Sequence, residues 1–241
     1  MPLLSRLFAS SGDKKSYPCD YIALPDGSSL RLTFFAHASI AIEYRGLHIY
    51  VDPVAQNADY EALPKADIIL VTHSHYDHFD MAAIDLLRKE STAILCDKTS
   101  AEAFAGDCFT MLPGATARPA DGITVDAVAA YNTSPAQLQF HPREREDCGY
   151  VVSFDAGVRI YISGDTEPIE EMRALHDIDI AFICANQPYT MKPEQVVEAV
   201  GMIRPKILYP YHFGQVDDPT DVEALRELVG PLAEVRLRPL A

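Results

Sequence analysis

Four side chains that commonly bind metal ions lie within one six-residue segment: His73, His75, Asp77 and His78. The segment follows residues 67–72, a nearly continuous apolar run that predicts a strand buried on both faces. Side chains two residues apart on an extended chain point the same way, so His73, His75 and Asp77 can share one side. A helix predicted just beyond them lets His78 approach from another direction. Imidazole suits zinc, and an Asp–His pair can hold a second ion, so the segment predicts a metal site.

The elements around this segment predict an α/β fold made of two strand-rich halves. Apolar and β-branched runs predict strands, and helical spacing predicts short helices between them. Arg45-Gly46 suits a hairpin turn, and Asp80 suits the N-cap of the first helix. Two halves edged with helices predict two sheets packed face to face with helices outside, in a single domain over residues 29–241. Residues 1–28 are expected to be a loosely ordered lead-in. The predicted strands are 30–35, 40–44, 47–51, 67–72, 93–96, 123–130, 149–154, 158–163, 178–184 and 207–211, and the predicted helices are 81–90, 170–175, 194–203 and 221–229.

Because of residues 73–78, the chain resembles the metallo-β-lactamase-fold superfamily of metal-dependent hydrolases. The His73-x-His75-x-Asp77-His78 pattern matches the superfamily signature, although Tyr76 stands where a small residue is common. Three further segments resemble the superfamily in its chain order: one ends in Asp52-Pro53, one in Gly164-Asp165-Thr166, and one contains His212-Phe-Gly214. The resemblance spans about residues 30–215. It implies a four-layer αβ/βα sandwich of the metallo-β-lactamase type.

One branch of the superfamily is more similar than the rest. The segment Phe34-Phe-Ala-His37-Ala-Ser39 resembles the Gly-His-Ser segment of the branch that includes ascorbate-6-phosphate lactonase and N-acylphosphatidylethanolamine phospholipase D. Two roles stay open for His37: a pocket residue or a hydrogen-bonded core histidine.

The resemblance implies a first metal ion held by His73, His75 and a third histidine. The position expected for that third histidine is Asn132, whereas His141 lies nearby in the sequence. Imidazole is a better zinc ligand than an amide, so His141 is the expected ligand. If Asn132 takes that place, the first ion is weakly held or keeps an extra water. The charged residues 143–147 next to His141 are expected to form a loop that could rim the pocket.

The second ion is implied to be held by Asp77, His78 and His212, with Asp165 bridging the two ions. Asp52 is expected to support a ligand by fixing its tautomer or loop position. Zinc is the first choice and two ions are expected; manganese or iron remains an alternative. The di-iron oxygen-reducing members of the superfamily usually carry Glu at the position of His75, which disfavours a redox role.

These residues predict a hydrolase in which a metal-activated hydroxide attacks a small ester, lactone or phosphodiester. Asp165 bridges the ions and Asp77 orients the nucleophile, so these two carboxylates are the predicted catalytic residues. The alternative is a binding or sensor protein that keeps the fold but has lost turnover, and Asn132 motivates it. An activity screen with metal supplied distinguishes the two.

The composition of the chain favours some classes of binding partner and disfavours others. With 35 acidic and 20 basic residues the formal net charge is −15, which disfavours nucleic acid and, with no basic patch, a nuclease. A small-molecule substrate is expected, and no oligomeric state is predicted. The five scattered cysteines contain no Cys-x-x-Cys pair, which suits reduced thiols and disfavours a cysteine zinc site. There is no secretory apolar region and no run approaching the roughly 20 residues of a membrane span, so the cytoplasm is expected.

Overall fold

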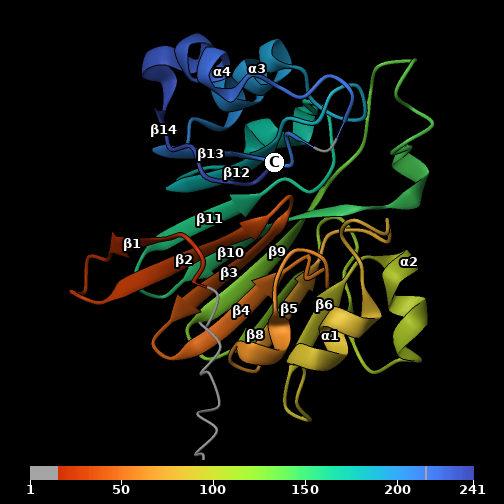
Figure 1. Cartoon of the computed structure of the whole chain (residues 1–241), viewed down its shortest axis with the longest axis vertical. Coiled ribbons are helices and arrows are strands. Elements are labelled where there is room, and N and C mark those ends of the chain that lie inside the picture. Colours follow the sequence, from red (N-terminus) through yellow and green to blue (C-terminus); the bar gives the residue numbers. More distant parts are fainter. Residues whose placement is uncertain (1–15, 215) are drawn as a thin grey trace, which may run out of the picture.

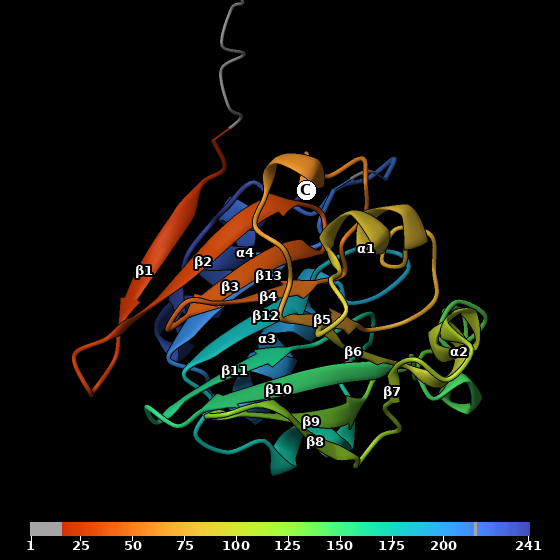
Figure 2. The same cartoon turned by 90° about the horizontal axis from the view of Figure 1, so that it is seen from below.

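Two mixed sheets face each other in the computed structural model, which describes residues 16–214 and 216–241. Helices cover the outer faces of both sheets (Figures 1 and 2). The predicted four-layer α/β sandwich is therefore confirmed. In the described chain the first sheet contains β1 (Cys19–Ala23), β2 (Ser29–Ala36), β3 (Ser39–Tyr44), β4 (Leu47–Val51), β5 (Ile68–Val71), β6 (Ala93–Cys96) and β7 (Phe109–Thr110), in that spatial order. The second contains β8 (Thr116–Ala120), β9 (Ile123–Ala129), β10 (Cys148–Phe154), β11 (Val158–Ile162), β12 (Ile180–Cys184), β13 (Ile207–Tyr211) and β14 (Glu234–Val235).

Both sheets change from antiparallel to parallel pairing partway along. In the first sheet β1 to β4 are antiparallel neighbours and β4 to β7 are parallel. In the second, β8 to β11 are antiparallel and β11 to β14 are parallel. Parallel strands end at the same edge of their sheet, and ligands of α/β sheets bind beyond those carboxyl ends. The loops after β4, β5, β11, β12 and β13 are therefore the segments that can build a site.

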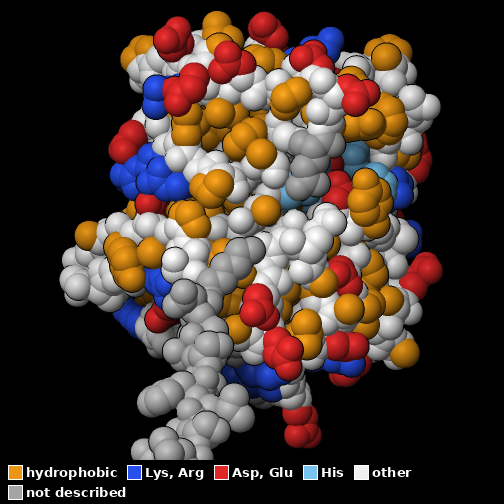
Figure 3. All heavy atoms as spheres, in the orientation of Figure 1, with side chains coloured by type: hydrophobic (Ala, Val, Ile, Leu, Met, Phe, Trp, Pro, Cys, Tyr) orange, Lys and Arg blue, Asp and Glu red, His pale blue; other side chains and the backbone are white. Residues whose placement is uncertain are grey.

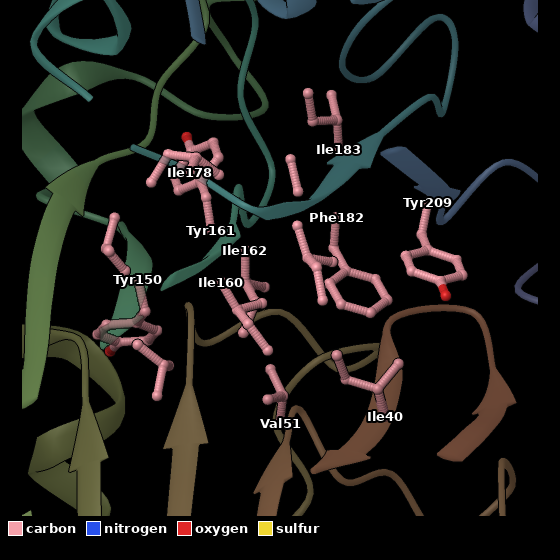
Figure 4. Packing of buried hydrophobic residues seen from close by; sticks show 14 of the residues in the cluster. Ile40, Val51, Tyr150, Ile160, Tyr161, Ile162, Ile178, Phe182, Ile183 and Tyr209 are labelled. Atoms are coloured by element: carbon pink, nitrogen blue, oxygen red, sulfur yellow. The ribbon is translucent and has the colours of Figure 1, made fainter. Parts of the chain in front are cut away.

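The main core lies between the sheets. Figure 4 shows Ile40 and Val51 of the first sheet facing Ile160, Phe182 and Tyr209 of the second. All five are nearly or fully buried, and a large apolar side chain buried in this way contributes about 1.5–3 kcal/mol. The rings of Phe182 and Tyr209 stack with centroids 5.0 Å apart. This packing holds the two parallel edges side by side.

A second core lies between the first sheet and helix α1 (Met81–Leu87). Strand β5 serves both cores: Ile68 and Leu70 face the other sheet, whereas Ile69 and Val71 pack toward the helix. This alternation agrees with the prediction of a strand buried on both faces. The other helices are α2 (Lys98–Ala101), α3 (Pro193–Ile203) and α4 (Val222–Val229), with short 3-10 helices at Tyr60–Ala62, Glu102–Phe104, Arg143–Arg145, Glu170–Ala174 and Gly230–Leu232.

Local sequence patterns predicted the bounds of most helices and strands to within a few residues. The Asp80 side chain accepts a hydrogen bond from the backbone N–H of Ala82, as an N-cap does. Helix α1 ends at Leu87, short of the predicted residue 90, because Arg88 is already extended. The predicted helix 170–175 is a 3-10 helix. The short segments β7, β8, β14 and α2 were not predicted.

The expected lead-in over residues 1–28 is wrong for Cys19–Ala23. These residues form β1, which pairs in register with β2 from Cys19 opposite Thr33 to Ala23 opposite Ser29. An ion pair fixes the strand from the far end of the chain, because Arg238 Nη2 lies 2.6 Å from Asp20 Oδ1. Arg238 is remote from Asp20 in sequence, so a local reading of composition misses this support for the strand, although its pairing partner β2 follows directly along the chain. Residues 1–15 lie outside the described part. No helix in the described chain is long and apolar enough to cross a membrane.

Candidate metal centre

The predicted ligands sit in the loops at the carboxyl edge of both sheets. Asp52 follows β4, residues 73–78 follow β5, Asp165 follows β11 and His212 follows β13. His37 lies in the turn between β2 and β3, and His141 in the loop between β9 and β10. His37, Asp52 and His212 have positive φ angles of 56°, 43° and 52°. Such backbone costs about 1–3 kcal/mol per residue and is retained mainly at functional sites.

One glycine permits the loops of the two sheets to touch. Gly164 has φ +61°, and a Cβ there would lie 2.9 Å from the carbonyl oxygen of Cys148 and 3.2 Å from Cβ of Thr72. A side chain would therefore separate Asp165 from the loop that carries His73. The segment between β11 and the 3-10 helix Glu170–Ala174 therefore needs glycine before the aspartate.

Three imidazoles form the first group, here called the histidine cluster: His73, His75 and His141. One ring nitrogen from each lies within 4.8 Å of those of the other two. His73 Nε2 is 3.2 Å from His75 Nδ1, and the rings of His75 and His141 have centroids 4.8 Å apart. His73 and His141 are almost fully buried. The structure therefore brings His141 to the two histidines of the signature.

The second group, here called the mixed cluster, contains His37, Asp77, His78 and His212, whose ligand atoms also lie within 4.8 Å of one another. Asp77 Oδ2 is 3.1 Å from His37 Nε2, 3.4 Å from His212 Nε2 and 3.9 Å from His78 Nε2. His37, left open between two roles by the sequence, thus lies among the predicted ligands of the second ion.

Asp165 lies between the two clusters. Its Oδ2 is 3.4 Å from His141 Nε2 and 3.4 Å from His212 Nε2, and its Oδ1 is 3.4 Å from His78 Nε2. The side chain is almost fully buried. A carboxylate in this position can contact an ion in either cluster.

The donor atoms fit metal ions because several of them are buried without partners. Within the described chain, Asp165 Oδ1 and the Nε2 atoms of His78 and His212 make no hydrogen bond. An unpaired buried polar atom is costly, and a buried charge more so. Divalent cations in the two clusters would satisfy these atoms together, which is the usual reason for carboxylates and imidazoles to converge in a protein interior.

The charge states also suit cation binding. Burial and neighbouring histidines hold the pKa of His73 well below its usual value and lower the pKa of His75 to about 4. Both rings are therefore neutral near pH 7, with lone pairs available. Burial acts against charge at His212, but Asp165 outweighs it and raises the pKa of His212 to about 10. The same pairing outweighs burial at Asp165 and holds its pKa well below the usual range. A cation would take the place of the proton on His212.

Asp52 is positioned to orient a ligand. Its Oδ2 lies 2.8 Å from His78 Nδ1, and its two oxygens accept hydrogen bonds from the backbone N–H and the hydroxyl of Thr72 at 2.8 and 2.7 Å. All three residues are fully buried. Because Nδ1 of His78 faces the carboxylate, Nε2 is directed to the mixed cluster.

Asp147 has a similar place beside the histidine cluster, and the sequence did not reveal it. Its Oδ2 lies 3.5 Å from His141 Nδ1 and accepts a hydrogen bond from Arg145 Nε at 2.8 Å. Arg145 also donates to Ser74 Oγ at 3.1 Å. The only sequence signal was the charge of residues 143–147, which resembles an ordinary surface loop. Its contact with His141 depends on how that loop folds.

Asn132 is turned away from the histidine cluster. Its Nδ2 donates to the backbone oxygens of Tyr189 and Gln137, at 2.7 and 3.1 Å. Its backbone N–H donates to the carbonyl oxygen of His141 at 2.8 Å. Asn132 therefore holds the loop that presents His141.

A cavity of about 310 Å³ opens onto both clusters. In Figure 3, pale blue histidine side chains are visible between the upper and lower halves, beside hydrophobic side chains. The described residues lining the cavity are His37, His75, Tyr76, Asp77, Phe140, His141, Asp165, Asn186, Tyr189 and Val216. A small molecule can therefore reach the candidate ligands.

Comparison with known proteins agrees with this site. Residues 31–212 match the model of the beta-lactamase superfamily domain. A UPF0173 metal-dependent hydrolase from Koribacter versatilis is 30% identical over 206 residues, covering 78% of this chain and 86% of the relative. A crystal structure of a candidate metal-dependent hydrolase from Parabacteroides distasonis has a TM-score of 0.88 and 42% identity, covering 94% of this chain and 100% of that chain.

A metallo hydrolase from Ignicoccus hospitalis has the same fold, with a TM-score of 0.75 and 23% identity over 89% of this chain and 97% of that chain. The chain therefore belongs to the beta-lactamase superfamily, in the family of metal-dependent hydrolases that includes the Koribacter protein. The predicted superfamily is confirmed.

Proposed function

We propose that the protein is a binuclear metal-dependent hydrolase that cleaves a small ester, lactone or phosphodiester. The observation that carries this proposal is the position of Asp165, whose two oxygens face ligand nitrogens of both clusters at 3.4 Å. A carboxylate between the two clusters could contact an ion in each of them, which supports a site for two ions. A cytoplasmic location and a small-molecule substrate belong to the same proposal.

The two clusters divide the ligands. The histidine cluster (His73, His75 and His141) would hold the first ion. The mixed cluster would hold the second through Asp77, His78 and His212, with His37 as a further candidate ligand. Zinc suits this imidazole-rich set, with manganese or iron as the alternative. When bound, a divalent ion supplies a nucleophile at neutral pH by lowering the pKa of water from about 16 to about 7.

The chain itself contributes position and exclusion of water. Asp52, 2.8 Å from His78 Nδ1, would fix the orientation of His78, and Asp147, 3.5 Å from His141 Nδ1, would favour one orientation of His141, so the ligand nitrogens would need little reorganisation during reaction. Asp77 is one-fifth exposed and lines the cavity, so its carboxylate can orient an attacking water. The walls around the cavity limit the number of waters that compete with substrate.

The alternative of a binding or sensor protein arose from Asn132. His141 lies beside His73 and His75, so Asn132 no longer gives a reason to expect a weakened first metal position. Hydrolysis is therefore the function we put forward.

The test combines metal analysis with activity. Protein purified without chelators is expected to contain about two ions per chain and to hydrolyse generic esters, lactones or phosphodiesters when metal is supplied. His75→Ala is expected to abolish metal-dependent turnover and to keep the circular dichroism spectrum. His176→Ala is the matched control, because that histidine is exposed and lies outside both clusters. Full activity in His75→Ala, or no turnover by protein carrying two ions, contradicts the proposal.

A further inference from the structure

We infer that the substrate is an uncharged carbonyl compound, an ester or lactone that carries an apolar group and an N–H or O–H donor, which Asn186 orients in the cavity. This inference rests on the proposed hydrolase function and selects among its substrate classes. It comes from the residues of the cavity wall that are not candidate metal ligands. In the described chain these are Tyr76, Phe140, Asn186, Tyr189 and Val216.

The wall is mainly aromatic. Phe140 and Tyr189 meet edge to face, with ring centroids 4.9 Å apart and planes at 78°. Tyr189 remains 40% exposed and Tyr76 is 84% exposed, so both rings offer apolar surface that their own chain leaves uncovered. Such surface beside a reactive centre favours a substrate with an apolar or aromatic group.

The aromatic pair is held in place and is not an incidental rim. Phe140 and Tyr189 come from separate loops, and Asn132 connects them by donating to Gln137 O in one and to Tyr189 O in the other. Phe140 N–H in turn donates to Gln137 O at 2.9 Å. The segment before helix α3 and the segment that presents His141 are thereby fixed to one another.

No lysine or arginine lines the cavity in residues 16–214 and 216–241. Arg145, which lies beside the metal-binding segment, is engaged by Asp147 Oδ2 and Ser74 Oγ instead. Sites that select phosphate esters usually present arginine or lysine to the phosphate oxygens. Asp77 and Asp165 also face this cavity, and the charge of bound ions would offset theirs. Away from those ions the described wall offers no positive charge, so a substrate with an anionic substituent remote from the reacting bond is disfavoured relative to an uncharged one.

Asn186 is the polar group of this wall. It is 5% exposed, and its Oδ1 is buried without a hydrogen-bond partner in the described structure. Its backbone is held in place, because the backbone carbonyl oxygen of Asn186 accepts from the N–H groups of Tyr189 and Thr190 at 2.9 and 2.8 Å. An amide oxygen without a partner in a binding cavity can orient a ligand by accepting one hydrogen bond, here from an N–H or O–H of the substrate.

The first experiment compares matched probes on the full chain loaded with zinc or manganese. The probes are 4-nitrophenyl butyrate, 4-nitrophenyl acetate, the anionic mono-4-nitrophenyl succinate and bis(4-nitrophenyl) phosphate, each corrected for the metal-buffer background. The butyrate and the succinate share one leaving group and differ in the negative charge at the end of the acyl chain. We expect kcat/KM for the butyrate to exceed that for the succinate by about tenfold or more. The phosphodiester should show the smallest enhancement over background.

The outcomes separate this inference from the proposed function. If the phosphodiester or the succinate is preferred and its turnover is lost in His75→Ala, the hydrolase proposal stands and the substrate class is wrong. If metal-loaded protein turns over none of the probes, both fall.

Wall variants give the second experiment. Tyr189→Ala should raise KM for the butyrate more than it lowers kcat and should reduce the butyrate-to-acetate preference, with metal content unchanged. Asn186→Ala should lower kcat/KM about tenfold for a lactone that carries an amide N–H and less for 4-nitrophenyl acetate, which has no donor. Tyr21→Ala, at a 67% exposed tyrosine on β1, is the control. An unchanged preference in Tyr189→Ala, or an equal loss for both probes in Asn186→Ala, overturns the inference.

Discussion

The two candidate metal positions differ in charge and in how they are supported. The histidine cluster consists of three imidazoles and has no carboxylate of its own, whereas the mixed cluster contains Asp77 together with three imidazoles. An anionic ligand strengthens the attraction for a divalent cation in a buried site. The mixed position should therefore bind its ion more tightly, and the histidine position should depend more on Asp165.

Their supports show the same asymmetry. Asp52 is fully buried at the end of a strand, and it contacts His78 at 2.8 Å while accepting two hydrogen bonds from Thr72. Asp147 lies in a loop, 3.5 Å from His141, and shares its carboxylate with Arg145. A ligand anchored by strand ends is more strongly fixed than one presented by a loop. Substitutions can therefore distinguish the two positions.

The largest effect is expected for Asp165→Asn, because that side chain faces both clusters. The amide keeps the shape but removes the negative charge and is a poor metal ligand. Metal content should fall by more than one ion per chain and hydrolysis should fall to the metal-buffer background. Elemental analysis and steady-state kinetics on the same preparation check this. If the variant retains two ions and full activity, Asp165 is not required for metal binding in either cluster.

The next largest effect on activity is expected when a ligand of the histidine cluster is removed, and it differs from the effect of removing one from the mixed cluster. His141→Ala should remove one ion and leave the other bound, with activity reduced at least about 100-fold, above the range usual for supporting residues. His37→Ala should weaken binding in the mixed cluster but retain an ion there, since three other ligands remain.

Titration with a metal-sensitive dye gives both affinities. If the tighter affinity is the one lost in His141→Ala, the expected order of the two positions is reversed.

A smaller effect is expected from the supporting carboxylates. Asp52→Asn should reduce metal affinity or activity about 10- to 100-fold, and Asp147→Asn should reduce it less. Asp52→Asn should also lower the free energy of unfolding by about 1–3 kcal/mol, because the amide nitrogen that replaces Oδ2 cannot accept from the Thr72 hydroxyl and from His78 Nδ1. Thermal melts of metal-free protein measure this second effect. Equal losses in the two variants would remove the distinction between strand-anchored and loop-anchored support.

The sequence by itself determined the fold class and the part of the site formed by consecutive residues after β5. The apolar run of β5 and the period of two in residues 73–77 depend only on neighbouring residues, so they predict where three side chains point. The alternation of strand-rich and helical segments likewise indicates a layered α/β chain. For Asp165 and His212, the sequence indicated positions through resemblance to a family with the same chain order.

Tertiary structure decided the remaining contacts, because they join residues far apart in the chain. The choice between His141 and Asn132 depends on how the loop before β10 packs against the segments that follow β11 and β12, where Glu167 N–H donates to Tyr131 O and Asn132 Nδ2 donates to Tyr189 O. The position of His37 among the mixed-cluster ligands depends on the packing of the β2–β3 turn against β13, where His212 N–H donates to the carbonyl oxygen of His37 at 3.2 Å. Strand β1 pairs with the next strand, β2, but the ion pair that supports it comes from Arg238, near the other end of the described chain. Long-range hydrogen bonds and close packing carry no local periodicity, and so the sequence pattern alone does not reveal them.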